Sequence, residues 1–415
     1  MKILIVSTSD TQGGASKAAY RLHKALLKAE IDSLMLVQDK RTDEHTIIGP
    51  ETKIQKSFAK IRPYLDQLPL KKYKNRTQTL FSPAWLPFSG IIDKINKVNP
   101  DIVHLHWICN GLMRIEDIAE IKTPIVWSLH DMWAFTGGCH YDEGCGFYTK
   151  ECGYCKVLGS NNKNDLSMKA FKRKQKTFTR KKDITIIGLS NWLLNCSKSS
   201  ALLSSKNHIN LPNPIDTNFF KIIDKKVSRR LWNLPDNKKL ILFGAISADS
   251  DPRKGFEKLR ESLQKLEDKN SIELVVFGSS ELKSSQNFGF NTHCLEYLHD
   301  DASLITLYNA VDVIVVPSLQ ENLSNIIMES LSCGLPVVAF NIGGNNDIIE
   351  HKQNGYLAKP FECEDLAHGI EWILNNPNCN ELSRNAREKI VKEFDSAIVA
   401  KKYIKLYEKI IKHIR

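Results

Sequence analysis

Short apolar runs alternate with segments of helical periodicity along most of the chain, and this alternation limits the possible folds more than any other feature. The apolar runs occupy residues 2–7, 34–37, 101–106, 124–129, 184–189, 239–244, 272–278, 311–316 and 336–340. Between the first two runs, Ala15–Ala29 carries apolar residues at helical spacing. Strands that alternate with helices build parallel sheets covered by helices. The sequence therefore predicts an α/β protein.

A stiff segment near the middle of the chain, Leu211–Asp216, separates two series of strands. Its two prolines flank an asparagine, which favours an extended connection over a helix or strand. We expect one doubly wound, Rossmann-like domain at 1–212, a second at 213–395, and a C-terminal helix at 396–415 that packs back on the first. Ligands of such folds bind beyond the carboxyl ends of the strands, so we expect the two domains to face each other across a cleft.

The composition excludes several classes of protein. Hydrophobic residues make up 42% of the chain and charged residues 25%, which is typical of a globular domain and not of a disordered or collagen-like chain. A membrane-spanning helix needs roughly 18 consecutive apolar residues, and no run approaches that length. The apolar run in Met1–Ser7 is shorter than the roughly 7–15 residues of a secretory signal. We therefore expect a cytoplasmic protein.

The chain is basic, with 58 Lys and Arg against 47 Asp and Glu and a net charge of +11. Such a charge favours anionic partners: phosphorylated small molecules, nucleic acids or an acidic membrane. The excess is greatest in a basic segment at 163–182, where Lys169–Lys182 holds eight basic residues and no acidic one, with Phe171 and Phe178 interleaved. This stretch is either a solvated helix face or a surface that docks the protein on anionic lipid.

Two glutamates follow the strand that ends at Pro317-Ser318. Glu321 lies in the loop, a helix is expected near Asn322–Cys333, and Glu329 lies eight residues after Glu321. The first turn of a helix offers unpaired N–H groups and a partial positive charge, which suit a phosphate. Glu321 can then accept hydrogen bonds from sugar hydroxyls and Glu329 from a ribose diol. Alternatively, Glu321 caps the helix and Glu329 is a surface charge.

Together with other motifs, this pattern resembles the retaining family 4 glycosyltransferases of GT-B fold (glycosyl transferases group 1), as found in bacterial surface polysaccharide biosynthesis. The further shared motifs are Gly13-Gly14, His130, Pro212-Asn213-Pro214, Asp251–Gly255, Ser332–Ala339 and Gly343-Gly344. The resemblance covers nearly the whole chain. It implies transfer of a sugar, with retention, from a nucleotide-diphosphate sugar to a hydroxyl of a saccharide or lipid-linked saccharide.

The same resemblance assigns roles to individual residues. It implies that His130, Lys254 and Glu321 are catalytic, with His130 on the transferred sugar. Arg253 and Lys254 would hold the diphosphate, one as a planar fork and the other as a point charge. The donor would also contact Gly13, Gly14, Asn322, Leu323, Ser324 and Glu329. Charge on the departing diphosphate is stabilised in place, so the resemblance implies no cofactor for catalysis.

Some features of these motifs leave alternatives open. Arg253 and Lys254 are otherwise surface residues of a Pro-Gly turn, and a lone histidine at a strand end is often structural. His104 and His106 share one face of another strand and are possible cleft residues. The sequence also departs from the family, which often has Arg or Lys where Ala245–Ser247 stands and a glycine where Leu323-Ser324 stands.

Four of the ten cysteines lie in a glycine-rich loop at 137–159. They are Cys139, Cys145, Cys152 and Cys155. Four thiolates suit a tetrahedral, structural zinc ion, which would order a loop that has little core of its own. The first two spacings are wider than in a zinc finger, so reduced thiols or a redox pair are alternatives.

Two other functions fit parts of the sequence. A nucleotide-sugar epimerase of the same fold would share the donor site but needs acid and base groups on both faces of the sugar. A nucleic-acid-binding protein is suggested by charge alone, and the sequence shows no recognised nucleic-acid motif.

Overall fold

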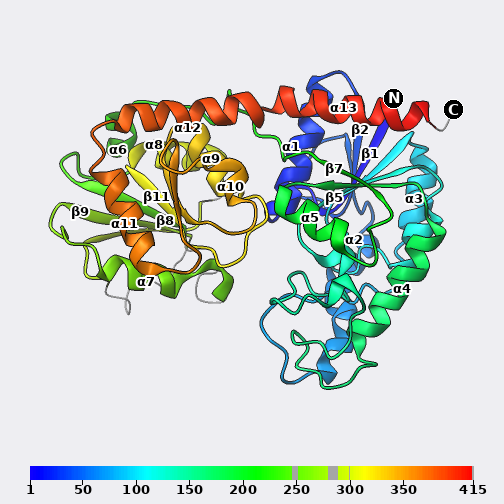
Figure 1. Cartoon of the computed structure of the whole chain (residues 1–415). Helices are drawn as coiled ribbons and strands as arrows, with labels where there is room; N and C mark the ends of the chain where they lie inside the picture. The colour runs from blue at the N-terminus through cyan, green and yellow to red at the C-terminus, as the bar shows by residue number, and fades with distance from the viewer. Residues whose placement is uncertain (245–250, 279–287, 299, 414–415) are drawn as a thin grey trace. The chain divides into compact units, whose positions relative to one another are not determined.

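The computed structural model describes residues 1–244, 251–278, 288–298 and 300–413, and it divides into two compact units (Figure 1). Unit 1 comprises Met1–Pro214 with Ser396–Arg415, and unit 2 comprises Ile215–Asp395. The division falls within the Pro-rich segment, two residues after the position expected from the sequence.

Unit 1 is built on a seven-stranded sheet in which every strand pair is parallel. Its strands are β1 (Lys2–Ser9), β2 (Asp32–Asp39), β3 (Ile47–Ile48), β4 (Ile102–Leu105), β5 (Ile125–Leu129), β6 (Ile184–Gly188) and β7 (Asn207–Asn210). The order β3-β2-β1-β4-β5-β6-β7 reverses direction between β1 and β4. That reversal is the topological switch point, beside which open α/β sheets bind ligands.

Helices and short 3₁₀ turns connect these strands. They are α1 (Gly14–Lys28), α2 (Lys53–Asp66), η1 (Leu68–Lys72), α3 (Ile91–Val98), η2 (Glu116–Glu120), η3 (Trp133–Phe135), η4 (Phe147–Thr149), α4 (Leu166–Arg180), α5 (Asn191–Ser199) and α13 (Ser396–Lys412). α2 begins at a capping box formed by Thr52 and Gln55. α13, the red helix in Figure 1, buries Tyr403 and Tyr407 completely and packs beside α1.

Unit 2 contains a six-stranded parallel sheet with the same kind of reversal. Its strands are β8 (Lys239–Gly244), β9 (Ile272–Phe277), β10 (Thr292–Leu295), β11 (Val313–Val316), β12 (Val337–Phe340) and β13 (Gly355–Ala358). The order β10-β9-β8-β11-β12-β13 is that of the doubly wound dinucleotide-binding fold, and its switch point lies between β8 and β11. The prediction of two doubly wound α/β units is confirmed.

The helices of unit 2 include one 3₁₀ turn that carries predicted site residues. The elements are α6 (Lys225–Leu231), η5 (Pro252–Lys254), α7 (Phe256–Gln264), α8 (Asp301–Ala310), α9 (Asn325–Ser332), α10 (Asn345–Ile348), α11 (Cys363–Leu374) and α12 (Cys379–Glu393). Apart from the partly exposed edge strands β7 and β10, both sheets are buried on their two faces, so their strands read as continuous apolar runs. Within the described ranges, no helix is long and apolar enough to cross a bilayer.

The basic segment folds as α4, and the structure corrects its predicted role. Phe171 and Phe178 face the core of unit 1, each at most 2% exposed. Lys174 is also fully buried, donates to the carbonyls of Trp133 and Thr136, and lies over the Trp133 ring. Its Nζ therefore anchors the turn after β5, and burial lowers its pKa to about 7. The aromatic residues expected to enter lipid are unavailable because they form the core.

Candidate functional site

In unit 2, the loops that follow β8 and β11 meet at the switch point. Lys254 ends the 3₁₀ turn after β8, and Glu321 lies in the loop after β11. Lys254 Nζ lies 3.8 Å from Glu321 Oε2, and both side chains are partly exposed. The structure thus brings together two of the predicted site residues, one cationic and one anionic, where this fold binds ligands.

Two glycines allow these loops to approach each other closely. Gly255 has φ +70°, and a Cβ there would lie 1.9 Å from the Pro317 carbonyl oxygen. Gly343, in the loop after β12, has φ +52°, and its Cβ would lie 1.8 Å from the Glu321 carbonyl oxygen. Only glycine fits such contacts. The first contact holds the turn after β8 against Pro317 at the start of the Glu321 loop, and the second holds the loop after β12 against Glu321 itself. Both glycines belong to motifs named from the sequence.

Arg253 is held differently from Lys254. Its Nε and Nη2 donate to Asp251 at 2.9 and 2.7 Å, a bidentate pair. Burial raises the pKa of Asp251, but the hydrogen bonds and charge of Arg253 outweigh it and lower the pKa overall. Because this edge of the guanidinium already binds a carboxylate, the structure favours Lys254 over Arg253 as the cation for a ligand. The expected departure at Ala245–Ser247 lies outside the described residues.

α9 starts three residues later than the sequence suggests. Its N-cap is Ser324, whose side chain accepts from the backbone N–H of Ile327. The alternative in which Glu321 caps the helix is therefore wrong. Asn322 and Leu323 are buried beside Ser324, whose hydroxyl accepts the capping hydrogen bond.

Glu329, in the second turn of α9, is 3% exposed. It accepts a hydrogen bond of 3.1 Å from the hydroxyl of Tyr308 in α8. At this exposure the alternative in which Glu329 is a surface charge is wrong. The hydrogen bond from Tyr308 offsets part of the cost of burying the carboxylate. Its predicted role toward a ribose stays a prediction.

Two further acceptors lie in the loop of Glu321 and at the start of α10. The side-chain oxygens Gln320 Oε1 and Asn345 Oδ1 are buried and have no hydrogen-bond partner in the described part of the chain. Buried acceptors are nearly always paired in folded proteins, so these two oxygens stand out beside Glu321 as acceptors that lack a partner among the described residues. The sequence signal was slight: Gln320 precedes Glu321, and Asn345 follows the glycine pair.

In unit 1, the predicted glycine pair lies at the switch point. Gly13, with φ +86°, is the N-cap of α1, and no side chain caps this end. The loop before it is held by Asp10, a buried carboxylate that accepts from the backbone N–H groups of Thr11, Arg41 and Thr42 at 2.8–2.9 Å. Asp10 fixes the path of the glycine pair, and the sequence analysis did not single it out.

His130 directly follows β5 and is paired with a second histidine. Its Nε2 lies 2.9 Å from Nδ1 of His106, which follows β4. His106 is 3% exposed, and its Nε2 has no hydrogen-bond partner among the described residues. Burial lowers the pKa of His130 to about 4 and that of His106 well below its usual value. Both rings are therefore neutral at pH 7.

His104 is a core residue and not the possible cleft residue expected. Its ring is fully buried, with Nδ1 2.7 Å from the Tyr407 hydroxyl and Nε2 2.9 Å from Ser128 Oγ. The His104 and His106 rings are 4.4 Å apart, so they share one face as predicted. His104 links α13 to the sheet and supports the ring of His106.

Asp131, next to His130, organises the turn that opens the cysteine-rich loop. Its carboxylate accepts from His140 Nδ1, Trp107 Nε1 and the Trp133 N–H at 2.6–2.9 Å. Burial alone would raise the pKa of Asp131, but these partners, His140 foremost, lower it overall. The carboxylate therefore stays ionised and fixes the backbone immediately after His130.

The four loop cysteines are reduced and divided between environments. Cys139 and Cys155 pack in one apolar cluster, Cys152 packs against the main core of unit 1, and Cys145 is half-buried. Burial raises the pKa of all four thiols. In the described ranges, no three or more His, Cys, Asp or Glu side chains form a metal-binding group. The four thiols as arranged thus do not fit a zinc ion, and the zinc site stays a prediction from the sequence alone.

Comparison with known proteins identifies one part of the chain. The family model "Glycosyl transferases group 1" matches residues 224–389, which lie within unit 2 and include the Lys254 and Glu321 pair. Residues 224–389 form a glycosyl transferases group 1 domain. The switch-point loops described above are therefore loops of this group 1 domain.

Two curated relatives contain related sequence. An N,N'-diacetylbacillosaminyl-diphospho-undecaprenol alpha-1,3-N-acetylgalactosaminyltransferase of Campylobacter jejuni is 28% identical over 200 residues, which is 47% of this chain and 52% of the relative. A UDP-Gal:alpha-D-GlcNAc-diphosphoundecaprenol alpha-1,3-galactosyltransferase of Escherichia coli is 29% identical over 126 residues, 29% of this chain and 33% of the relative. The chain thus matches about half the length of such relatives or less.

A solved structure matches both units. Sucrose-phosphate synthase from Thermosynechococcus elongatus superposes with a TM-score of 0.70 at 17% identity and covers 100% of each chain. At this identity the likeness shows the fold alone. It confirms the predicted GT-B fold of two Rossmann-like units beyond the group 1 domain. The epimerase and nucleic-acid alternatives gain no support from these comparisons.

Proposed function

We propose that the protein is a retaining glycosyltransferase. It transfers a sugar from a nucleotide-diphosphate sugar to a hydroxyl of a saccharide or lipid-linked saccharide in the synthesis of a cell-surface polysaccharide. The observation that carries this proposal is the Lys254–Glu321 pair, which lies 3.8 Å apart at the switch point of the group 1 domain. The relatives named for lipid-linked acceptors and a UDP-sugar donor support the acceptor and donor classes.

Lys254 is the proposed partner of the diphosphate. As the bond between the sugar and the diphosphate of the donor breaks, negative charge grows on the leaving phosphate oxygens. A fixed cation therefore stabilises the transition state more than the ground state. The partly exposed Nζ of Lys254 has Glu321 at 3.8 Å. The adjacent Asp251–Arg253 pair keeps the turn in place. The amino end of α9 adds the partial positive charge of its dipole.

Glu321 and Glu329 are the proposed acceptors for donor hydroxyls. The backbone carbonyl of Glu321 is in close contact with Gly343, so the loop that carries its carboxylate is held in place and loses little conformational freedom on binding. The buried Glu329 would accept from the ribose diol while Tyr308 holds its other side. The oxygens of Gln320 in the same loop and of Asn345 at the start of α10, which have no partner among the described residues, are further proposed acceptors.

His130 is the proposed contact to the transferred sugar. Because its pKa is about 4, the ring is neutral at physiological pH and does not supply a cation. A neutral imidazole offers one donor and one acceptor nitrogen. The pair with His106 at 2.9 Å would fix the orientation in which this ring meets a sugar hydroxyl.

The test is a panel of nucleotide sugars added to the full chain, with thermal unfolding as the first readout. The correct donor is expected to raise the Tm, and the Lys254→Ala variant is expected to lose that increase. The anomeric configuration of the product, read by NMR, then decides retention. Appearance of an epimer from the donor alone would favour the epimerase, and no stabilisation by any nucleotide sugar would contradict the proposal.

A further inference from the structure

An exposed apolar stripe runs along α2 of unit 1. Ile54, Phe58 and Ile61 are 82%, 43% and 50% exposed. At about 100° per residue they fall within about 60° of helix arc. Apolar residues this exposed are ordinary when scattered, but a contiguous row of them marks an interaction surface. Tyr64, one turn further on, is 78% exposed and extends the row.

A lysine stripe lies beside the apolar one on the same helix. Lys53, Lys56 and Lys60 also fall within about 60° of arc, are exposed, and form no ion pair with any residue that the structure describes. From residue 51 to 76 the chain has eight Lys and Arg and two acidic residues. One of those two, Asp66, is buried and accepts from the backbone N–H of Trp85. The exposed charge beside the stripe is therefore almost wholly positive.

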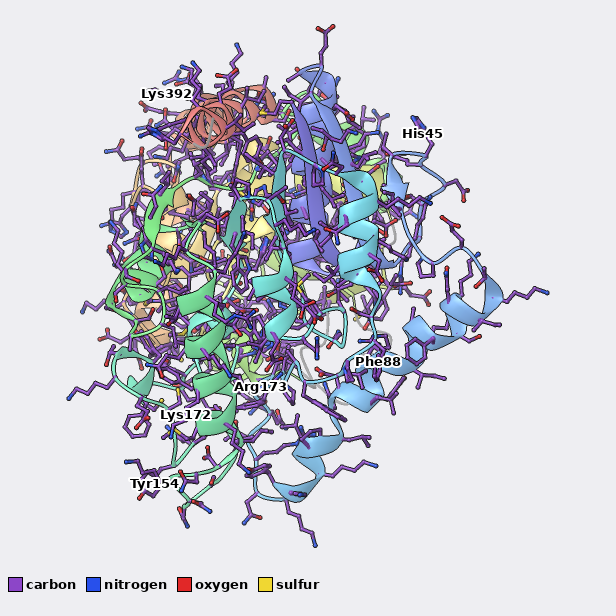
Figure 2. All side chains as sticks on the ribbon, turned by 90° about the vertical axis from the view of Figure 1, so that its right-hand side faces the viewer. His45, Phe88, Tyr154, Lys172, Arg173 and Lys392 are labelled. Atoms are coloured by element: carbon purple, nitrogen blue, oxygen red, sulfur yellow. The ribbon has the colours of Figure 1, made fainter. Side chains whose placement is uncertain are left out.

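Phe88 adds a second exposed apolar group, held out by a buried arginine. Its side chain is 89% exposed, and its φ of 60° is in the left-handed region, which is costly for a residue other than glycine. Arg62 of α2 is 3% exposed and donates to the carbonyls of Leu86, Pro87 and Phe88 at 3.0–3.2 Å. Figure 2 shows Phe88 beside the blue helical segment.

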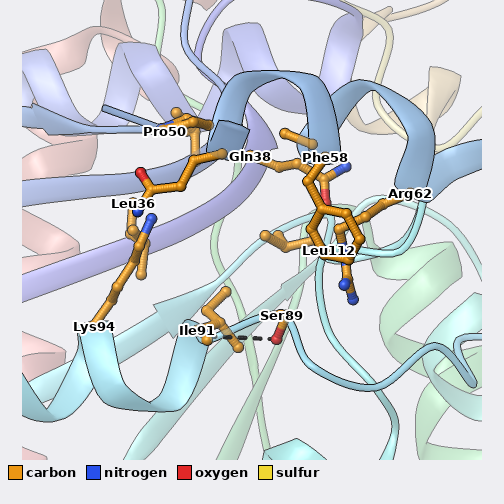
Figure 3. Close-up of a pocket in the computed structure, with 13 residues that line it drawn as sticks. Leu36, Gln38, Pro50, Phe58, Arg62, Ser89, Ile91, Lys94 and Leu112 are labelled. Carbon is orange, nitrogen blue, oxygen red and sulfur yellow. Dashed lines mark hydrogen bonds between the residues drawn. The ribbon is translucent and has the colours of Figure 1, made fainter. Parts of the chain in front are cut away.

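The apolar surface continues inward from Phe58. A cavity of about 290 Å³ lies at the base of α2, with Phe58, Ile91 and Leu112 in its wall (Figure 3). Lys94 contributes to the same cavity. An apolar recess beside an exposed stripe can receive a flexible acyl chain, whereas a flat protein partner would leave it unfilled and lose contacts there.

We propose that α2 and the Phe88 loop form a docking surface for an anionic lipid bilayer. The docking surface consists of Ile54, Phe58, Ile61, Tyr64 and Phe88 with Lys53, Lys56 and Lys60. Its apolar groups enter the boundary between headgroups and acyl chains while the lysines bind lipid phosphates. This inference names a partner for the proposed function and rests on it for the lipid-linked acceptor. It replaces α4, whose aromatic residues are buried.

The experiment measures vesicle binding of the full chain without any sugar substrate, so it does not depend on glycosyl transfer. Flotation is carried out with vesicles of phosphatidylglycerol and phosphatidylcholine, and with pure phosphatidylcholine. The protein is expected to float with the anionic vesicles only, and less so in high salt. Absence of binding to anionic vesicles at low salt would overturn the proposal and leave the proposed function standing.

Charge is tested with two matched triple variants. One changes Lys53, Lys56 and Lys60 to Gln, and the other changes Lys169, Lys172 and Lys176 of α4 to Gln, all of them exposed. Each lysine near an anionic surface raises the affinity for it about fivefold. The α2 variant is therefore expected to bind anionic vesicles at least tenfold more weakly. The α4 variant is expected to stay within about threefold. Equal losses would overturn the proposal, because they would show attraction by net charge alone.

Insertion is tested by changing Ile54, Ile61 and Phe88 to Ser. The control changes Val227 and Leu231, exposed apolar residues of α6 in unit 2. Vesicle binding is expected to fall at least tenfold in the first variant and to stay unchanged in the control, with the same Tm as the parent in both. If instead the parent sediments as a dimer that the first variant dissociates, the surface binds a second copy and the lipid proposal is wrong.

Discussion

Lys254 and Glu321 lie 3.8 Å apart although 66 residues separate them in the sequence. Each belongs to a loop that follows one of two adjacent strands, β8 and β11, on either side of the switch point. Parallel pairing of Val313–Val315 with Ile241–Phe243 puts the carboxyl ends of these strands together. The pair is therefore a product of the sheet order.

Removing either member of this pair is expected to abolish most transfer. Loss of a preorganised group that stabilises charge in the transition state typically costs about 10²–10³ in kcat. We expect Lys254→Ala and Glu321→Ala to reach that range with a Tm close to the parent value, because both side chains are partly exposed. Arg253→Ala is the comparison, with a smaller loss, since Asp251 already binds its guanidinium. Near-parental kcat in Lys254→Ala would refute the assignment.

Glu329 is expected to affect donor binding more than the chemical step. Glu329→Gln keeps the size of the side chain but loses its charge, and we expect KM for the donor to rise about tenfold, as for one lost charge-assisted hydrogen bond. Tyr308→Phe removes only the hydroxyl that faces Glu329 at 3.1 Å and should give a smaller rise. Steady-state kinetics over a range of donor concentrations measures both, and an unchanged KM with reduced kcat would contradict the ribose role.

The fully buried His104 and the half-buried His130 predict how stability depends on pH. Burial lowers the pKa of His104 to about 3 and that of His130 to about 4, against about 6.5 in the unfolded chain. The unfolded state therefore binds more protons between these values, so stability is complete above about pH 6.5 and is lost as the pH falls toward 4. Thermal unfolding from pH 7.5 to 4.5 should show a falling Tm, with a shallower fall in His104→Gln.

The same pKa values predict the pH dependence of transfer. Since His130 is neutral from about pH 5 upward, the profile of kcat/KM should show no histidine ionisation between pH 6 and 8. A step near pH 6.5 that disappears in His130→Asn would show that the charged ring takes part, contrary to the proposed neutral contact.

The close contact at Gly255 predicts that one added methyl group at this position strongly reduces transfer. Gly255→Ala would place its Cβ 1.9 Å from the Pro317 carbonyl oxygen, so the two loops must separate and transfer should fall at least about 10²-fold. Gly289→Ala is the matched control: its φ of +78° is similar, but its Cβ would have only Lys269 Nζ at 4.0 Å. The control should lose about 1–2 kcal/mol of stability from backbone strain and keep its activity. Equal losses of activity would point to strain in place of loop contact.

Removal of metal ions is expected to leave the chemical step unchanged. The proposed charge stabilisation comes from Lys254 and the amino end of α9, which need no metal. Turnover after dialysis against EDTA should therefore match the untreated protein. A loss that Mg²⁺ or Mn²⁺ restores would show that a metal ion shares the diphosphate.

Much of the fold could be predicted from the sequence because the strands are buried on both faces. Runs such as Lys239–Gly244 and Val311–Val316 read as continuous apolar segments. The short edge strands β3, β7, β10 and β13 carry a weaker signal and were not predicted, because β7 and β10 are partly exposed and β3 and β13 have only two and four residues. The expected start of α9 at Asn322 is three residues too early, because the side chain of Ser324 caps the helix and Asn325 is its first residue.

The sequence by itself determined which residues carry chemistry at each strand end, because motif composition and strand periodicity are local. Only the tertiary structure decided which of these residues are exposed or paired, and so which can contact a ligand or partner. In the folded chain Arg253 binds Asp251, and Lys254 lies beside Glu321. Glu329 is buried against Tyr308, and His130 is paired with His106. The tertiary structure also turned the aromatic residues of α4 inward and left those of α2 exposed. Exposure and pairing depend on which distant segments pack together, and neighbours in the sequence do not encode that.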